Sequence, residues 1–247
     1  MRIVVFTDVH ANLPALNAAL AAIDSQGYDL LVHTGDAIGI GPFPTECLER
    51  LLNLPRCRYV MGNHDAWFAE GLPSPQPSWM SDGEFAHHQW THAQLDPVLR
   101  AKVNSWPYVI TETIEAVTMS FLHYPLTTGN SFLPILQQPT VAELGQAFAA
   151  YSGELIFYGH HHPFADMVGA ARYINPGSLG CAATAHARYT VVDIHSGQWQ
   201  VSHHKIPYDD APLVTAFQER DVPERMLINK FFYGGRLWME THSETQP

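Results

Sequence analysis

Short apolar runs and amphipathic segments alternate along residues 2–61, and this order restricts the fold more than any other feature of the chain. Three runs have the β-branched, apolar profile of buried strands: Arg2–Thr7, Leu30–Thr34 and Arg58–Met61. Helices are predicted over 13–23, with Asn12 as the N-cap, and over 45–54, because leucines recur there at steps of three and four residues. This βαβαβ order predicts a parallel sheet with right-handed crossovers, whose ligands gather at the carboxyl ends of the strands.

The rest of the chain is predicted to combine one insertion with further strands and helices. Residues 66–107 are rich in proline and aromatic side chains, with a helical stretch over 85–102, and we interpret them as a cap insertion that roofs a site. The remaining predicted elements are a helix over 141–151 and strands over 108–114, 116–123, 155–158, 171–174, 188–194 and 198–206. Residues 208–247 are predicted to be a C-terminal helical extension with a polar tail. A length of 247 residues suits a single domain, 1–247.

Charge and cysteine content narrow the classes of function. With 13 Lys+Arg against 24 Asp+Glu, we expect no long nucleic acid as partner, and an anionic substrate would need positive charge from bound metal. Cys47, Cys57 and Cys181 are widely spaced and lack a CxxC motif, so neither a disulfide framework nor a thiolate zinc site is indicated. We see neither a signal peptide nor an apolar run of bilayer length, and we therefore expect a cytoplasmic protein without a membrane partner. The sequence leaves a homo-oligomer open.

Oxygen and imidazole ligands follow five of the predicted strands. They are Asp8 and His10, Asp36, the segment Asn63-His64-Asp65, His123, and the segment His160-His161-His162. Each motif alone could be a solvated loop, but the carboxyl ends of parallel strands meet along one edge, where these groups would converge. A glycine precedes the ligands in three of the five motifs and lets the backbone turn sharply there.

Convergent Asp, Asn and His side chains without cysteine suit manganese, iron or zinc, and they disfavour calcium or a thiolate site. The candidate ligands outnumber what one ion needs. A pair of divalent or trivalent ions that share one carboxylate, about 3.5 to 4 Å apart, accounts for the surplus. The sequence therefore predicts two metal ions as cofactors.

In this order, and each behind a strand, DVH, GD, GNHD, a single His and GHHH resemble the signature of the calcineurin-like metallophosphoesterase superfamily over residues 1–178. NPGS at 175–178 and the insertion ending in LDPVLRAKVNSWP are similar to its prokaryotic branch of small phosphodiesterases and phosphatases. The resemblance implies an α/β fold of four layers, α-β-β-α, in which two mixed sheets pack face to face beneath the cap insertion. The implied metal ligands form two sets that share Asp36 as a bridge: Asp8, His10 and His162 for one ion, and Asn63, His123 and His160 for the other.

Two further histidines of the signature have different expected places. By the same resemblance, His64 would sit beside the metals and protonate the leaving oxygen, with Asp65 as the candidate to orient it. The alternative for His64 is a hydrogen bond to a loop carbonyl. His161 is expected to point away from the metals and at most toward substrate, because residues i and i+2 of an extended segment face the same side and His160 and His162 already take the metal side.

The element GDAIGIG departs from the GDxxDRG of the superfamily's protein serine/threonine phosphatases. Gly39 and Ile40 stand at the places of its Asp and Arg, and GNHD replaces GNHE. We therefore do not expect a phosphoprotein phosphatase, and the group that holds His64 is left unassigned.

The remaining histidines and the cap aromatics can each be interpreted as structural residues or as ligand-binding residues. His88 and His92 are i, i+4 neighbours on the predicted cap helix and could bind a third ion or a substrate phosphate, although solvated helix faces are commoner. His33 lies within a strand and is expected to be a hydrogen-bonded core residue. The cap aromatics could stack on a nucleobase or form a small core of the cap: Trp67, Trp79 and Trp90.

Together these patterns predict dinuclear metal-dependent hydrolysis of a phosphate ester. The leading substrate is a small phosphodiester or nucleotide-type molecule, including dinucleoside polyphosphates or cyclic nucleotides, and a phosphomonoesterase or nucleotidase of the same mechanism is the alternative. The acidic balance disfavours a nuclease. From another class, a non-catalytic protein-interaction scaffold is the rival, because some members of this fold are scaffolds; such members tend to lose ligands that this chain retains.

Overall fold

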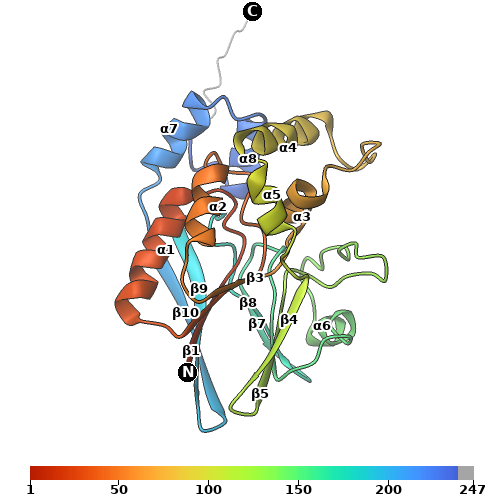
Figure 1. The fold of residues 1–247 in the computed structure, drawn as a ribbon, viewed down its shortest axis with the longest axis vertical. Coiled ribbons are helices and arrows are strands. Elements are labelled where there is room, and N and C mark those ends of the chain that lie inside the picture. The colour runs from red at the N-terminus through yellow and green to blue at the C-terminus, as the bar shows by residue number, and fades with distance from the viewer. Residues whose placement is uncertain (239–247) are drawn as a thin grey trace, which may run out of the picture.

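Residues 1–238 of the computed structural model form two five-stranded sheets and eight helices (Figure 1). The end of the predicted C-terminal extension, 239–247, lies outside the described residues. The first sheet has the order β10-β9-β1-β2-β3 and consists of β1 (Arg2–Phe6), β2 (Leu30–His33), β3 (Cys57–Tyr59), β9 (His186–His195) and β10 (Gln198–Pro207). The second has the order β4-β5-β6-β8-β7 and consists of β4 (Val109–Ile114), β5 (Val117–Leu122), β6 (Leu155–Phe157), β7 (Ala165–Val168) and β8 (Arg172–Asn175). The helices are α1 (Leu13–Gln26), α2 (Pro44–Leu52), α3 (Asn63–Glu70), α4 (Asp82–Gln94), α5 (Val98–Val103), α6 (Val141–Ala147), α7 (Ala211–Glu219) and α8 (Arg225–Phe232).

The predicted βαβαβ unit forms one side of the first sheet. β1 pairs in parallel with β2 and β2 with β3, whereas β9 adds to β1 in the antiparallel direction, so the sheet is mixed. α1 begins as expected, because the side chain of Asn12 accepts a hydrogen bond from the backbone N–H of Ala15 at 3.1 Å. The carboxyl ends of β1, β2 and β3 therefore lie along one edge.

Apolar side chains join the two sheets face to face. Val5 and Val32 of the first sheet and Phe121 and Phe157 of the second are fully buried in this core, and the two phenyl rings stack with centroids 5.3 Å apart. α1 and α2 cover the outer face of the first sheet, and α6 covers the outer face of the second. The predicted four-layer α-β-β-α sandwich is confirmed.

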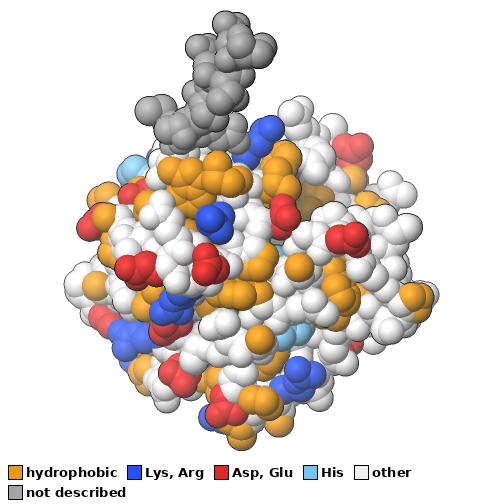
Figure 2. All heavy atoms as spheres, turned by 90° about the horizontal axis from the view of Figure 1, so that it is seen from above, with side chains coloured by type: hydrophobic (Ala, Val, Ile, Leu, Met, Phe, Trp, Pro, Cys, Tyr) orange, Lys and Arg blue, Asp and Glu red, His pale blue; other side chains and the backbone are white. Residues whose placement is uncertain are grey.

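Five helices gather at the end of the molecule toward which β1 runs, above the sheets in Figure 1: α3, α4, α5, α7 and α8. Figure 2 looks down on this end and shows hydrophobic side chains exposed between acidic and basic ones. α7 and α8 enclose a small apolar cluster of their own around Phe217 and Tyr233, which also includes Ile40 from the segment after β2. Both chain segments beyond the sheets, 66–107 and the part of 208–247 that the structure describes, thus lie over the same sheet edge.

Three local predictions were wrong. The cap helix predicted over 85–102 is two helices, because Leu95 is extended and the next residue, Asp96, precedes a proline, which disfavours helical backbone. Residues 63–70 form α3, where no helix is predicted. β7, with the sequence ADMV, has no counterpart among the predicted strands, because it lacks a β-branched run.

None of the helices within residues 1–238 combines the length and the apolar character that a bilayer crossing requires.

Truncation of a side chain in the core between the sheets should lower the stability of the protein strongly. We expect Phe157→Ala to lower the free energy of unfolding by about 3 to 5 kcal/mol, because the ring is fully buried between two sheets that close only partly over the gap. Phe231→Ala is the matched control, since that ring is 70% exposed, and a change of at most about 0.5 kcal/mol is expected. Urea unfolding followed by circular dichroism measures both, and equal losses would contradict this account of the core.

Candidate metal centre

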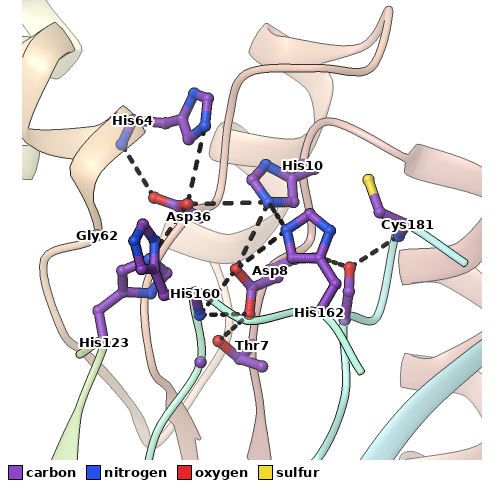
Figure 3. A network of polar contacts seen from close by, with 12 residues as sticks. Thr7, Asp8, His10, Asp36, Gly62, His64, His123, His160, His162 and Cys181 are labelled. Carbon is purple, nitrogen blue, oxygen red and sulfur yellow. Dashed lines mark hydrogen bonds and ion pairs between the residues drawn. The ribbon is translucent and has the colours of Figure 1, made fainter. Parts of the chain in front are cut away.

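The structure brings the seven predicted ligands together at the edge where strand ends of both sheets meet. Figure 3 labels six of them, all except Asn63. Asp8 and His10 follow β1, Asp36 follows β2, Asn63 begins α3 after β3, His123 follows β5, and His160 and His162 follow β6. The first sheet and α3 supply four of these side chains, and the second sheet supplies three. All seven residues are buried or half-buried.

Left-handed backbone turns several of these side chains toward one another. φ is +53° at Asp8, +46° at His10, +60° at Asp36 and +67° at His160. Such values are uncommon for residues other than glycine, and each costs on the order of 1 kcal/mol or more. The segment with His160 is therefore not extended, and the strand alternation expected for it was the wrong reason, although His160 and His162 do line the cleft described below and His161 does not.

One group of donor atoms surrounds His10. Its Nε2 lies 3.5 Å from Asp8 Oδ1, 2.9 Å from His162 Nε2 and 3.8 Å from Asp36 Oδ2. His162 Nε2 is in turn 3.7 Å from Asp8 Oδ1. Four donors from three strand ends thus enclose one point.

A second group surrounds His123 and shares Asp36 with the first. Nε2 of His123 lies 3.2 Å from Asp36 Oδ2 and 3.2 Å from Asn63 Oδ1. A ring nitrogen of His160 lies within 4.8 Å of the donor atoms of Asp36 and His123. Asp36 is therefore placed between the two groups.

Hydrogen bonds on the far side of two rings leave their Nε2 atoms directed into the groups. Nδ1 of His10 donates to the carbonyl of Ile38 at 3.3 Å, and Nδ1 of His123 donates to the carbonyl of Thr34 at 2.9 Å, because a carbonyl oxygen can only accept. In the neutral form of each ring, Nε2 then offers its lone pair to a cation between it and the carboxylate and amide oxygens. Metal bonds of about 2.0 to 2.2 Å separate neighbouring donors by about 2.8 to 3.6 Å. The distances of 2.9, 3.2, 3.2 and 3.5 Å fall within this range, and those of 3.7 and 3.8 Å exceed it slightly. The residues present therefore fit a pair of metal ions.

The electrostatics of the site also favour positive charge. Burial by itself would lower the pKa of His123, but the carboxylates of Asp36 and Asp8 outweigh burial and raise that pKa to about 9. Burial would likewise raise the pKa of Asp36, yet the neighbouring imidazoles hold it well below its usual value. Both carboxylates of the site, Asp8 and Asp36, are completely buried, so their charge needs a partner within the site.

Asp65 supports the backbone of the site and makes no hydrogen bond to the His64 ring among the described residues. Its carboxylate accepts from the backbone N–H groups of Asp36 at 2.7 Å, Ala37 at 3.0 Å and Gly62 at 3.1 Å. These bonds tie the segment after β2 to the start of α3. The expectation that Asp65 orients the His64 ring is thus not met, because the carboxylate is occupied by backbone donors.

His64 lies beside the shared carboxylate without a side-chain hydrogen bond on Nδ1. Its Nε2 is 4.0 Å from Asp36 Oδ2, and its backbone N–H donates to Asp36 Oδ1 at 3.0 Å. The ring packs against the rings of His10, Trp67 and His88, each with centroids 5.1 Å away. A side chain at Gly39 would collide with His64 Nδ1. The departure from GDxxDRG therefore removes a side chain from a position that faces this nitrogen.

Of the two cap histidines predicted to face substrate, His88 packs against the site, with its ring centroid 5.1 Å from that of His64. It is buried, its Nε2 has no hydrogen-bond partner among the described residues, and Glu84 Oε1 lies 3.8 Å from that atom. His92 packs on Phe68 instead, with ring centroids 5.6 Å apart, outside the cleft. His33 is buried as expected, but both of its ring nitrogens lack partners within residues 1–238, so the expected hydrogen bonding was wrong.

Two contributors were missed by the sequence. Cys181 is buried with its Sγ within 4.8 Å of the nitrogens of His10 and His162, although the spacing of the cysteines gave no metal signal. Phe232 of α8 packs against the ring of His162, with centroids 5.6 Å apart. No local pattern connects residue 232 to a site made by residues 8–162, because the contact arises only from the fold.

A cleft of about 940 Å³ opens onto the centre. Asp36, His64 and His160 form part of its floor, and the cap and α8 contribute Trp67 and Phe232 to its walls. A neighbouring cavity of about 310 Å³ between α4 and α8 shares His64 with it. The centre is therefore open to a small molecule beneath the helices at this end.

Comparison with known proteins places this arrangement in a family. The sequence model of the calcineurin-like phosphoesterase superfamily domain matches residues 1–197, which contain all seven predicted ligands and His64. The chain belongs to the calcineurin-like phosphoesterase superfamily. The uncharacterized protein MJ0912 of Methanocaldococcus jannaschii is 30% identical over 178 residues, which span 72% of this chain and 69% of that protein.

Two solved structures of similar fold extend the comparison to nearly the whole chain. The crystal structure of hypothetical protein PH1004 from Pyrococcus horikoshii OT3 superposes with a TM-score of 0.78 at 22% identity, covering 95% of this chain and 98% of that one. A metallophosphoesterase from Sphaerobacter thermophilus gives a TM-score of 0.72 at 25% identity, covering 93% and 97%. Both solved proteins therefore share the fold of this chain over more than nine tenths of its length.

Removal of one ligand should change the metal content. After dialysis against manganese, we expect about two ions per chain for the native protein and about one for His123→Ala, because only one donor group contains that ring. His161→Ala, which leaves both groups intact, is the matched control and should keep about two. Elemental mass spectrometry of folded protein gives the counts, and equal counts for all three proteins would contradict the assignment.

The close approach of Gly62 to the carboxylate of Asp36 should contribute to manganese affinity. We expect Gly62→Ala to weaken manganese binding by about 10- to 100-fold, because a Cβ there would collide with Asp36 Oδ1 and its backbone nitrogen. Gly145→Ala in α6 is the control, since its Cβ would meet Tyr173 Oη at an ordinary 3.7 Å. Calorimetric titration measures both affinities, and an unchanged affinity in Gly62→Ala would show that Asp36 needs no such close fit.

Proposed function

We propose that the protein hydrolyses small phosphodiesters with two metal ions. The observation that carries the proposal is the pair of donor groups that share Asp36, with the His64 imidazole beside them at the floor of an open cleft. Asp8, His10 and His162 would hold one ion, and Asn63, His123 and His160 the other. When bound, the ions would polarise the phosphate oxygens and lower the pKa of the attacking water.

His64 would act on the leaving oxygen. Burial lowers the pKa of His64 well below its usual value, while the Asp36 carboxylate works in the opposite direction. A neutral imidazole still has one N–H, so the ring can donate a hydrogen bond to the leaving oxygen as the ester bond breaks and stabilise the charge that develops there. The packing of Trp67 and His88 around it would hold the ring in place.

The charge of the cleft supports a diester over a monoester. Among the described residues that line it there is no Lys or Arg, whereas Glu70 and Glu84 are present. Two divalent ions and the carboxylates of Asp8 and Asp36 leave a net charge of about +2 for everything else bound there. A diester monoanion leaves more of that charge for the attacking water than a monoester dianion does, so the diester is the better fit.

Activity should depend on metal and on His64. Chelated protein is expected to be inactive and to regain hydrolysis of bis(4-nitrophenyl) phosphate with manganese, at a higher kcat/KM than for 4-nitrophenyl phosphate. We expect His64→Ala to lower kcat by about 10²- to 10⁴-fold for an alkyl diester, and by less for bis(4-nitrophenyl) phosphate because 4-nitrophenolate leaves without a proton, while the metal content stays unchanged. The control is His92→Ala, whose ring lies outside the cleft.

Each failure would have a definite meaning. Absence of turnover of either ester with manganese, iron or zinc in folded, metal-loaded protein would refute the hydrolase and favour a scaffold. A higher kcat/KM for the monoester would refute the diester preference alone.

A further inference from the structure

One face of α3 leads from the metal centre to the mouth of the cleft. His64, Trp67 and Glu70 follow one another at steps of three residues, so they share a helix face, and all three line the cleft. A rise of 1.5 Å per residue places Trp67 about 4.5 Å and Glu70 about 9 Å from His64 along the axis. A phosphate on the metals would therefore have its ester group beside an indole and a carboxylate.

A second indole extends this wall. The ring of Trp79, from the segment between α3 and α4, lies with its centroid 6.2 Å from that of Trp67, and the two planes are inclined by 31°. Trp79 is 65% exposed, so it is not part of a core of the cap. An indole held this far into solvent at the mouth of a cleft offers a free aromatic face to a ligand.

Two carboxylates accompany the indoles. Tyr108 donates from its hydroxyl to Glu70 Oε1 at 2.8 Å, which fixes the position of that carboxylate and leaves its other oxygen available. Glu84 of α4 lines the cleft as well as the neighbouring cavity. No Lys or Arg of the described cleft lining neutralises either group. The one ion-pair partner of Glu84 is the His88 ring, 3.8 Å away, among the described residues. Aromatic faces next to carboxylates that no Lys or Arg neutralises are the combination that binds organic cations.

We propose that this wall, formed by Trp67, Glu70, Trp79 and Glu84, binds a positively charged ester group of the substrate. The substrate is then a small phosphodiester whose one alcohol bears an ammonium group, with quaternary ammonium as the best match to the indoles. This inference rests on the proposed phosphodiesterase function and specifies its substrate class.

A nucleobase could stack on the indoles and donate an N–H to a carboxylate, but it is uncharged. It would therefore leave the negative charge of Glu70 and Glu84 without a counter-charge. Additional phosphates of a nucleoside polyphosphate would be repelled by the same two groups, since the described lining offers no Lys or Arg to them. The cation therefore accounts for the charge as well as the aromatic faces of the wall.

Two esters that differ only in charge test the proposal. 4-Nitrophenyl phosphorylcholine and 4-nitrophenyl 3,3-dimethylbutyl phosphate have the same leaving group and nearly the same shape, but only the first has a positive charge. With manganese-loaded protein at low salt, we expect kcat/KM for the choline ester to exceed that for the isostere by about tenfold or more. Added salt should reduce the ratio.

Charge-neutral variants assign the effect to the wall. Glu70→Gln keeps an oxygen acceptor for the Tyr108 hydroxyl, and we expect it and Glu84→Gln each to lower the ratio of the two kcat/KM values toward one. Glu219→Gln on the exposed side of α7 makes the same change in net charge far from the wall and should leave the ratio unchanged. A ratio that falls equally in all three variants would overturn the proposed site.

A binding measurement separates the substrate class from the chemistry. Tetramethylammonium should shift the isotope-labelled indole signal of Trp79, assigned with Trp79→Leu, and should not do so in Glu70→Gln combined with Glu84→Gln. If neither ester is hydrolysed with any metal, the proposed function fails, and this shift still decides whether the wall binds cations. Equal kcat/KM for the two esters, or a faster reaction with the 4-nitrophenyl ester of thymidine 5′-phosphate, would overturn the cation site while leaving the phosphodiesterase standing.

Discussion

Buried negative charge without a lysine or arginine partner in its ion pairs is the constraint around which this end of the molecule is built. Asp8 and Asp36 are buried, and imidazoles are the only groups that pair with them among the described residues, with the Nε2 atoms of His10 and His123 facing their carboxylates. Such an arrangement is costly unless a cation lies among the donors. Left-handed backbone at both aspartates adds strain that packing of the two sheets must maintain.

The supporting contacts explain why the centre keeps its geometry. Asp65 uses its whole carboxylate to hold three backbone N–H groups from two neighbouring strand ends, so the segment with Asp36 and the start of α3 move as one unit. Ser178 of the NPGS segment donates to the carbonyl of Asp8 at 2.8 Å and fixes the first strand end from the other side. The ligands are thus positioned by hydrogen bonds among loops, while the sheets determine only where those loops begin.

The sequence predicts what depends on local order and misses what depends on long-range contact. The alternation of strands and helices over residues 2–61 predicts the parallel unit, and the ligands at its strand ends predict that Asp8 and Asp36 meet, because parallel strands share an edge. His123 joins them from the second sheet, whose packing against the first is implied by the family resemblance and not by the order of these strands. The role of Asp65 was assigned wrongly, since nothing in GNHD shows that its carboxylate is used up by backbone donors. Phe232 and Cys181 were missed because their place beside the ligands is set by the path of a chain 19 to 70 residues beyond His162.

The position of α8 has a consequence for how such proteins diversify. The shared family domain ends at residue 197, whereas Phe232 from α8 packs on a ligand ring and forms part of the cleft wall. The predicted ligands and most of the cleft lining therefore lie within residues 1–197, and α8 adds one further wall from outside that range. Replacement of the residues after 197 alone would change this wall, and with it the substrate preference of a homologue, without altering any predicted ligand of the centre.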